Sequence, residues 1–202
     1  MNNFEKSLLY CFSEEELSKI QSVKIGIAGA GGLGSNCAMN LVRSGFKDIK
    51  IIDYDRIETS NLNRQFYFAN QVGEAKAFAL MQNLQKINPD VAITAIAETL
   101  DARNIIGYFE DCDIVVEAFD EAEMKSLLVE KLLPTKKLIV SASGIAGYGK
   151  ADGIKTRYIK ENLVLVGDLE SEVSDKNVAL SPKVNIAAAK QADVVLEYVL
   201  KK

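Results

Sequence analysis

Residues 23–34 read VKIGIAGAGGLG, a short apolar run that passes directly into a cluster of glycines. Short runs rich in β-branched side chains are typical of buried parallel strands. After the glycines, Leu33, Cys37 and Leu41 recur at roughly helical spacing, which predicts a helix. The sequence therefore places a strand, a glycine turn and a helix in immediate succession.

The glycine turn, Gly29-Ala30-Gly31-Gly32-Leu33-Gly34, has the spacing G-x-G-x-x-G. Glycines let the backbone approach a phosphate closely, and the N-terminus of the following helix offers free amides and a partial positive charge. We interpret the turn as a binding site for the phosphates of a nucleotide. The alternative is that the glycines serve only a tight turn.

A second strand follows the first helix. Ser44-Gly45 ends the helix, and residues 49–53 form the strand. Its last residue, Asp53, lies about 20 residues past the glycine turn, where a carboxylate can accept hydrogen bonds from ribose hydroxyls. A solvated carboxylate at a strand end is the alternative.

Helices and strands continue to alternate along the chain. The predicted helices span residues 73–88, 101–110 and 121–132, and the predicted strands span residues 91–97, 113–117 and 137–141. This alternation is typical of α/β proteins with right-handed crossovers. We therefore predict a Rossmann-like fold, in which helices cover both faces of a mostly parallel sheet.

The two ends of the chain differ from this core in their sequence pattern. At the N-terminus we expect a helical segment at residues 1–22. After the core we expect an antiparallel strand pair, at 154–159 and 163–166, that extends the sheet edge. An acidic mobile loop at 167–181 and a final helix from Ser181 to about residue 200 follow. The loop is either a lid or a plain solvated loop. Without repeats or a low-complexity linker, residues 1–202 are expected to form a single domain.

Composition excludes several classes of function. A net charge of −4 argues against nucleic acid as the main partner, because phosphate-backbone binding needs clustered Lys and Arg. No apolar run approaches the roughly 20 residues of a membrane span, and the first residues lack the pattern of a secretory signal, so a cytoplasmic location is expected. Cys11, Cys37 and Cys112 contain no C-x-x-C pair, which argues against zinc. Because the chain has no histidine, its chemistry must proceed without imidazole.

The segment after Asp53 separates ATP from a dinucleotide cofactor. Ser60-Asn61-Leu62-Asn63-Arg64-Gln65 follows Asp53-Tyr54-Asp55, and Lys76 lies on the next predicted helix. A guanidinium fork and an ammonium near the glycine turn would neutralise phosphates, which a triphosphate needs more than a dinucleotide does. Taken singly, Arg64 and Lys76 could each be ordinary surface cations.

In these residues, and in Asp120 at the end of Val115-Val116-Glu117-Ala118-Phe119-Asp120, the sequence resembles the ThiF/MoeB/HesA family, bacterial relatives of ubiquitin-activating enzymes. The resemblance covers about residues 20 to 145. It implies an adenylyltransferase that binds ATP through Gly29, Gly31, Gly32, Gly34, Asp53, Asp55, Ser60, Asn61, Asn63, Arg64, Gln65 and Lys76. Arg64, Lys76 and Asp120 are implied to be catalytic, with Asp120 ligating Mg²⁺; alternatively, Asp120 caps the helix that follows it.

The resemblance further implies the reaction and its partners. A carboxylate attacks the α-phosphorus of ATP, pyrophosphate leaves and an acyl-adenylate remains. The substrate is a small ubiquitin-like sulfur-carrier protein with a C-terminal Gly-Gly, of the ThiS type used in thiamine biosynthesis. The enzyme is expected to be a homodimer, and the aromatic run Phe66-Tyr67-Phe68 forms either a dimer surface or part of the core.

The chain departs from many relatives in three ways. It lacks the two C-x-x-C pairs that bind structural zinc, and it lacks a cysteine in the loop 167–181 that could carry sulfur or the activated carrier covalently. We therefore expect the activity to stop at the adenylate, with a separate protein as sulfur donor. No arginine precedes Arg43, so the N-terminal arginine that relatives contribute to a neighbouring site is missing.

Two other functions remain open from the sequence. A non-catalytic module that binds nucleotide or carrier would be consistent with the missing arginine and cysteines. An oxidoreductase linked to NAD or FAD would be consistent with the glycine turn and Asp53.

Overall fold

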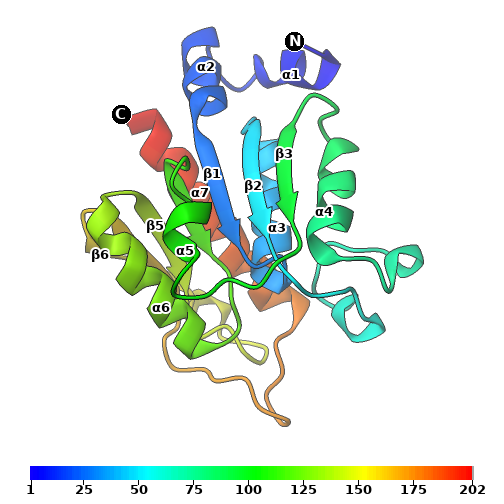
Figure 1. Ribbon diagram of the computed structural model, residues 1–202, viewed down its shortest axis with the longest axis vertical. Helices are drawn as coiled ribbons and strands as arrows, with labels where there is room; N and C mark the ends of the chain where they lie inside the picture. The colour runs from blue at the N-terminus through cyan, green and yellow to red at the C-terminus, as the bar shows by residue number, and fades with distance from the viewer. Residues whose placement is uncertain (202) are drawn as a thin grey trace.

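The computed structural model describes residues 1–201, and its helices and strands alternate as predicted (Figure 1). The strands are β1 (Lys24–Ala28), β2 (Asp48–Ile52), β3 (Ala92–Ile96), β4 (Ile114–Glu117), β5 (Leu138–Ala142), β6 (Lys155–Lys160) and β7 (Leu163–Gly167). The α-helices are α1 (Asn3–Leu8), α2 (Glu14–Ser22), α3 (Gly32–Arg43), α4 (Lys76–Gln85), α5 (Ile105–Tyr108), α6 (Ala122–Leu132) and α7 (Ser181–Lys201). Short 3₁₀ turns cover Thr59–Asn61, Ala69–Gln71, Leu133–Thr135 and Ala151–Gly153.

The strands form one seven-stranded sheet in the order β3-β2-β1-β4-β5-β7-β6. All neighbours are parallel except β6, which pairs antiparallel with β7 at the edge. The predicted α/β fold with an antiparallel edge extension is therefore confirmed. From β1 the chain runs outward to β3 and then crosses back to β4 on the other side of β1. Ligands of open α/β sheets bind at such a reversal, beyond the carboxyl ends of the strands.

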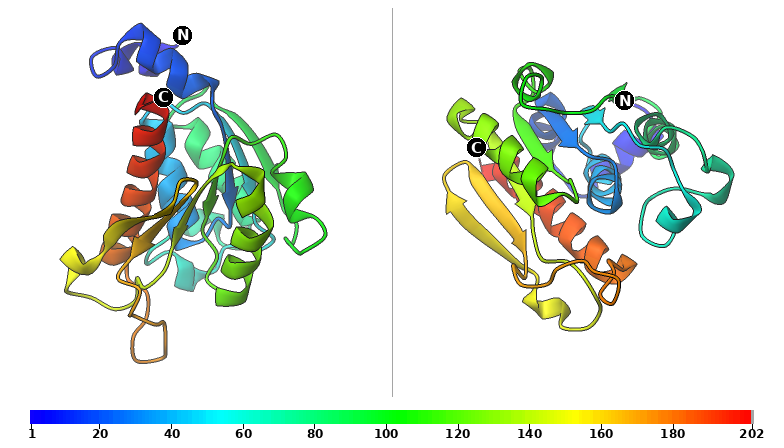
Figure 2. Two further views of the ribbon diagram at one scale, coloured as in Figure 1. Left: turned by 90° about the vertical axis from the view of Figure 1, so that its left-hand side faces the viewer. Right: turned by 60° about the horizontal axis from the view of Figure 1, so that its bottom comes forward.

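Helices cover both faces of the sheet. Helices α3, α4 and α7 lie on one face, and α5 and α6 lie on the other (Figures 1 and 2). Strand β4 shows why both faces are needed, because Ile114 and Val116 pack into the core on the α3 and α7 face while Val115 packs into the core on the α5 and α6 face. A strand that is apolar at every position is stable only when it is covered on both sides.

The N-terminal segment lies at the amino end of the sheet. The predicted cap of α2 is present, since the Ser13 hydroxyl accepts from the Glu16 amide and the Glu16 carboxylate accepts from the Ser13 amide. Helix α1 precedes it, and its buried Glu5 is paired with Lys47 at 2.8 Å. Both this segment and the end of α7 lie opposite the loop of residues 168–180 (Figure 2).

Two predicted helices are shorter than the sequence indicated. Residues 73–75 form a turn, because Gly73 has a φ of 93° and Arg56 and Ala75 form a β-bridge, so α4 begins only at Lys76. The prediction of a helix from 101 was also wrong at its start. There the Asp101 carboxylate accepts from the Arg103 amide and the Asn104 side chain accepts from the Asp101 amide, which are local bonds that compete with the helix.

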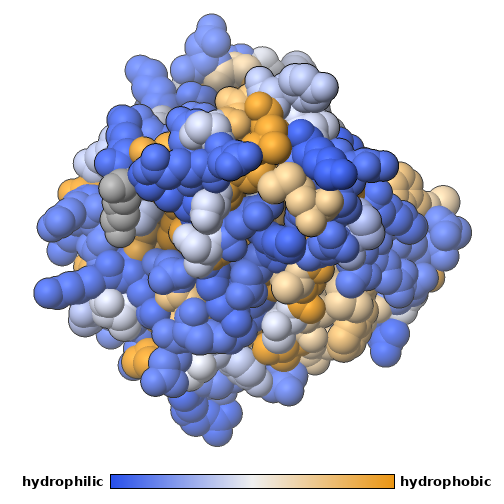
Figure 3. Space-filling view, turned by 90° about the horizontal axis from the view of Figure 1, so that it is seen from above, coloured by the Kyte–Doolittle hydropathy of each residue, from blue (hydrophilic) through white to orange (hydrophobic). Residues whose placement is uncertain are grey.

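The face at the amino end of the sheet is mostly hydrophilic, with small scattered apolar areas (Figure 3). In residues 1–201, no helix combines the length and the apolar character that crossing a membrane requires.

We predict that Gly26→Ala destabilises the fold. A methyl group on Gly26, in the middle of β1, would lie 2.4 Å from the ring of Phe109, which is itself fully buried. Overpacking of this kind lowers the free energy of unfolding by about 1–3 kcal/mol. Urea denaturation measures the effect. Gly107→Ala is the matched control, because nothing lies within 4 Å of the added methyl and alanine favours the α5 helix, so stability should rise by about 0.5–1 kcal/mol.

Candidate nucleotide-binding cleft

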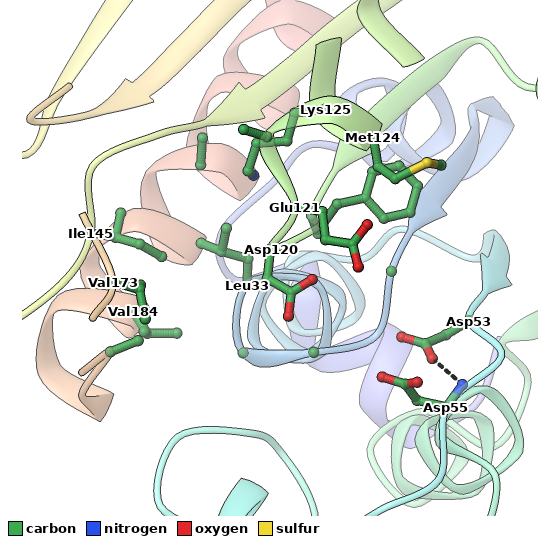
Figure 4. Close-up of a pocket in the computed structure, with 18 of the residues that line it drawn as sticks. Leu33, Asp53, Asp55, Asp120, Glu121, Met124, Lys125, Ile145, Val173 and Val184 are labelled. Atoms are coloured by element: carbon green, nitrogen blue, oxygen red, sulfur yellow. Dashed lines mark hydrogen bonds between the residues drawn. The ribbon is translucent and has the colours of Figure 1, made fainter. Parts of the chain in front are cut away.

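A cleft of about 800 Å³ opens at the carboxyl ends of β1, β2 and β4, where the strand order reverses. It is lined by nine of the residues that the sequence assigned to the site: Gly29, Gly31, Gly32, Asp53, Asp55, Arg64, Gln65, Lys76 and Asp120. Figure 4 shows the acids Asp53 and Asp55 at one side, Asp120 in the middle, and an apolar wall of Ile145, Val173 and Val184 at the other side.

The glycine turn is shaped by close backbone contacts. Gly29 has a φ of 96°, and a Cβ atom there would lie 2.9 Å from the Ala118 carbonyl oxygen. A Cβ atom on Gly34 would lie 1.9 Å from the Gly29 carbonyl oxygen, so no side chain fits. At Gly31 the nearest atom to an added Cβ is the Gln65 side-chain nitrogen at 3.9 Å, which leaves the turn open toward the cleft. Gly29 and Gly34 therefore pack against backbone atoms, whereas Gly31 leaves the turn open to the cleft.

Asp53 joins the glycine turn to the segment that follows β2. Its Oδ2 accepts from the Ala30 amide at 2.6 Å and its Oδ1 accepts from the Asp55 amide at 2.7 Å. Burial raises the pKa of this carboxyl above its ordinary value, although the bonds from Ala30 and Asp55 and the charge of Lys76 oppose the shift. Asp53 is thus held in place at the rim of the turn and differs from a freely solvated acid.

Both cations line the cleft together with the glycine turn. The Lys76 ammonium lies 2.6 Å from Asp55 Oδ2 and its side chain is only 8% exposed. The stem of Arg64 lies over Gly32, where an added Cβ atom would be 3.6 Å from Arg64 Cγ. Asn36 fixes this arrangement by donating to the carbonyl oxygens of Gly32 at 2.7 Å and Arg64 at 2.8 Å.

Four residues that the sequence assigned to nucleotide contacts do not line the cleft: Gly34, Ser60, Asn61 and Asn63. Gly34 instead packs against Gly29. The Asn61 side chain accepts from the Glu58 amide, and the Asn63 side chain accepts from the Arg64 guanidinium at 2.8 Å. In this structure the polar residues shape the loop that carries Arg64, and direct nucleotide contacts from them have no support in the geometry.

Asp120 lies on the turn between β4 and α6 with its carboxylate exposed to the cleft. Within residues 1–201 this carboxylate makes no hydrogen bond or ion pair, and the N-cap of α6 is Glu121, which makes no capping bond with its side chain. The alternative role as a helix cap is therefore not observed. The negative charge of Asp55, with smaller contributions from burial, Glu121 and Asp120, raises the pKa of Tyr54, which also lines the cleft.

Comparison with known proteins identifies the family. A model of the ThiF family matches residues 5–200. The chain belongs to the ThiF family. It is 36% identical over 143 residues to SUMO-activating enzyme subunit 2 of Dictyostelium discoideum, a match that covers 70% of this chain and 22% of that protein. It is 34% identical over 142 residues to the adenylyltransferase and sulfurtransferase UBA4 of Candida albicans, covering 70% of this chain and 32% of UBA4.

Two solved structures share the fold. The ATP complex of the E. coli tRNA N6-threonylcarbamoyladenosine dehydratase TcdA superposes with a TM-score of 0.82 at 22% identity, over 97% of this chain and 91% of TcdA. E. coli MccB with ATP superposes with a TM-score of 0.72 at 22% identity, over 92% of this chain and 59% of MccB. The chain spans about a third or less of the length of the two sequence relatives above.

Several cleft residues of this ThiF-family chain were not predicted. Lys125 lines the cleft, and the buried Glu117 lies behind it as its ion-pair partner. An acid at the end of an otherwise apolar strand is a signal that could have pointed to Glu117. Ile145 and Val173 lie in irregular segments, where no periodicity marks them as part of a cleft. Cys11, Cys37 and Cys112 do not line the cleft.

Of the predicted loop 167–181, Gly167 belongs to β7 and Ser181 begins α7. Residues 168–180 between them are irregular and form one wall of the cleft through Ser171, Glu172, Val173 and Ala179. Asp168 anchors this segment. Its Oδ1 accepts from the Glu170 and Ser171 amides at 2.9 and 2.8 Å, and its Oδ2 lies 3.2 Å from the Lys183 ammonium on α7. The Ser171 hydroxyl in turn accepts from the Ala146 amide at 3.0 Å. That the loop moves stays a prediction.

We predict that Asp168→Asn destabilises the protein in a pH-dependent way. Burial opposes ionisation, but the bonds from Ser171, Glu170 and Lys183 prevail and hold the pKa of Asp168 well below its ordinary value. A carboxyl with a lowered folded pKa stabilises above its unfolded pKa of roughly 3.9, and this contribution disappears as the pH falls through the folded pKa. At pH 7 the substitution should lower the free energy of unfolding by about 1–3 kcal/mol. Below about pH 4 the difference in free energy of unfolding between the variant and the wild type should narrow.

Chemical denaturation at pH 7 and at pH 3 measures this difference. Asp175→Asn is the matched control, since Asp175 is an exposed acid of the same loop. An equal cost of Asp168→Asn at both pH values would contradict the assigned charge effect.

Proposed function

We propose that this chain binds Mg·ATP in the cleft and transfers the adenylyl group to a carboxylate with release of pyrophosphate. The observation that carries the proposal is that Arg64, Lys76 and the carboxylate of Asp120 line one cleft together with the glycine turn. The names of the relatives support it, because UBA4 is an adenylyltransferase and TcdA has been solved with ATP.

The chemistry of the cleft suits a nucleoside triphosphate. The open backbone at Gly31 and the N-terminus of α3 would receive phosphate, and the Asp53 carboxylate would accept from the ribose. Ile52, Leu100 and Met124 supply apolar surface beside Asp53 for a base. Gln65 is nine-tenths buried, and its Oε1 has no hydrogen-bond partner within the described residues, so it can accept a bond from a ligand in the cleft.

The residues present also fit Mg²⁺. Mg²⁺ usually takes one or two protein carboxylates and completes its octahedron with phosphate oxygens and water. Asp120 offers an exposed carboxylate that has no partner among residues 1–201. In residues 1–201 there is no cluster of three or more acids, cysteines or histidines that could hold a metal by itself, which agrees with a site completed by phosphate. Mg²⁺, when bound, would supply charge neutralisation on the triphosphate.

The reaction needs no general base from this chain. The attacking carboxylate is already ionised at neutral pH, so the absence of histidine is no obstacle. Arg64 and Lys76 would align the triphosphate and stabilise the negative charge that develops on pyrophosphate. The Lys76 ammonium is held in position by the carboxylate of Asp55, 2.6 Å away.

The proposed substrate is a small ubiquitin-like sulfur-carrier protein ending in Gly-Gly, of the ThiS type, in thiamine biosynthesis. The relatives named after SUMO activation and sulfur transfer support a substrate of this class. Because the three cysteines do not line the cleft, a separate protein would deliver the sulfur and this chain would stop at the adenylate. We place the protein in the cytoplasm.

ATP–pyrophosphate exchange in the presence of a Gly-Gly carrier tests this proposal. Arg64→Ala and Asp120→Ala should each lower the exchange rate by about two to three powers of ten, because each removes a charge that the transition state requires. Arg103→Ala is the matched control, since this guanidinium is 90% exposed, pairs with Asp101 and lies outside the cleft. Mass spectrometry of the carrier should show an adenylate adduct.

Undiminished exchange in both cleft variants would refute the assigned roles. Carrier binding without pyrophosphate release would favour the non-catalytic alternative, and tight NADH binding that ATP does not displace would favour an oxidoreductase.

We further propose that the protein is a homodimer. The aromatic run 66–68 divides between core and surface, because Tyr67 is buried while Phe68 is 50% exposed, and Val72 and Phe78 nearby in sequence are also exposed. A contiguous apolar patch formed by these side chains would be typical of an interface. Light scattering at micromolar concentration should give twice the 22.1 kDa chain mass, and Phe68→Glu should reduce it to the monomer while Tyr148→Glu does not. A monomeric wild type would exclude the dimer.

A further inference from the structure

Glu117 is a fully buried carboxylate directly behind the cleft. It is the last residue of β4, has 0% exposure and accepts four hydrogen bonds from three donor groups. The Phe119 amide donates to Oε1 at 2.7 Å, the Lys125 ammonium contacts both oxygens at 3.0 and 3.3 Å, and the Ser141 hydroxyl donates to Oε2. A buried charge is tolerated only when it is paired and hydrogen-bonded in this way.

These bonds close a short segment of chain on itself. Glu117 lies at one end of the turn 118–121 and Lys125 lies one helical turn into α6, so the ion pair fixes both ends of the turn that carries Asp120. The Ala118 amide donates to the Ala28 carbonyl oxygen at 2.9 Å, and the Ala118 carbonyl contacts Gly29. From the opposite face of the sheet, Gln191 of α7 donates to the Glu117 carbonyl oxygen at 3.0 Å. Bonds to Lys125 of α6, Ala28 of β1 and Gln191 of α7 therefore hold the turn 118–121 against the glycine turn.

Lys125 lines the cleft, yet its charge is directed away from a ligand. Its side chain is 19% exposed, and its ammonium lies 3.0 Å from the Glu117 carboxylate. Figure 4 shows Lys125 next to Met124 and above Glu121. Within the described residues, in contrast, the Arg64 guanidinium bonds to the Ser60 carbonyl and the Asn63 side chain, which are neutral acceptors. Lys125 is thus neutralised by an internal acid and is poorly suited to bind phosphate.

A buried ion pair is weak evidence for stability, since its desolvation cost can exceed its attraction, and apolar residues of similar size often serve the fold as well. The ion pair of Glu117 and Lys125 lies at the turn that carries Asp120, and a role beyond packing would explain this position. We propose that Glu117 and Lys125 are positioning residues, which hold the turn 118–121 so that Asp120 faces a metal ion bound with the triphosphate. The inference rests on the proposed function. Partners that orient a metal-binding carboxylate typically change metal affinity by about 10–100-fold when removed.

The test compares Glu117→Gln and Lys125→Met with Glu5→Gln. Glu5 is the matched control because it is also a buried carboxylate paired with a lysine, but it lies at the opposite end of the sheet. Amide hydrogen exchange of residues 118–121 is measured in the nucleotide-free protein, ATP binding is measured by calorimetry with and without Mg²⁺, and the Mg²⁺ concentration that half-saturates pyrophosphate exchange is determined for each variant.

Both cleft variants should exchange the amides of 118–121 at least about tenfold faster and should need about 10–100-fold more Mg²⁺, while metal-free ATP binding stays unchanged. Glu5→Gln should lower the melting temperature without changing either readout at the cleft. Lys125→Arg should restore the wild-type Mg²⁺ dependence, because a guanidinium can make the same bonds to Glu117. Where Glu117→Gln does not fold, Ser141→Ala removes one of the four bonds and is expected to give the same effects in smaller measure.

Unchanged hydrogen exchange and unchanged Mg²⁺ dependence in Glu117→Gln would overturn the positioning role. A wild-type protein that binds no Mg·ATP would overturn the proposed function instead, and in that case the hydrogen-exchange comparison still reports whether the pair holds the turn.

Discussion

The backbone contact between the glycine turn and the turn that follows β4 constrains the rest of the cleft. Gly29 and Gly34 approach so closely that a side chain on Gly34 would overlap a carbonyl oxygen, and Gly29 itself rests on the Ala118 carbonyl. The parallel pairing of β1 with β4, which extends to Ala28 and Glu117, brings these two turns together at the point where the strand order reverses. Everything that lines the cleft, from Asp53 to Asp120, is positioned relative to that contact.

The electrostatics of the cleft follow from pairing inside the protein. Lys76 is held by Asp55 and Lys125 by Glu117, whereas Arg64 has only neutral acceptors and Asp120 has no partner in the described part of the chain. The paired lysines keep fixed positions, and the unpaired groups keep their capacity for a ligand. The negative charge of Asp120 is not compensated by either paired lysine. A divalent cation bound together with phosphate would compensate it, which is the physical reason for linking Asp120 to Mg²⁺.

The cleft also has two chemically different sides. Acids and the glycine turn occupy one side, and Ile145, Val173 and Val184 form an apolar wall on the other (Figure 4). That wall comes from the segment after β5, from the loop of residues 168–180 and from α7, which are far apart in sequence. Asp168 and Lys183 join these segments, so the shape of the apolar side depends on one ion pair that lies outside the cleft itself.

The sequence by itself determined the order of strands and helices, the glycine turn and the antiparallel edge, and it supplied the residues assigned to the site. Each of these follows from a short stretch of sequence, as a spacing, a cap or a turn signal. The tertiary structure decided which of those residues meet: it brought Arg64, Lys76 and Asp120 to one cleft, kept Ser60, Asn61 and Asn63 out of it, and paired Glu117 with Lys125. These outcomes depend on the crossover from β3 to β4 and on contacts between distant segments, which no local pattern contains.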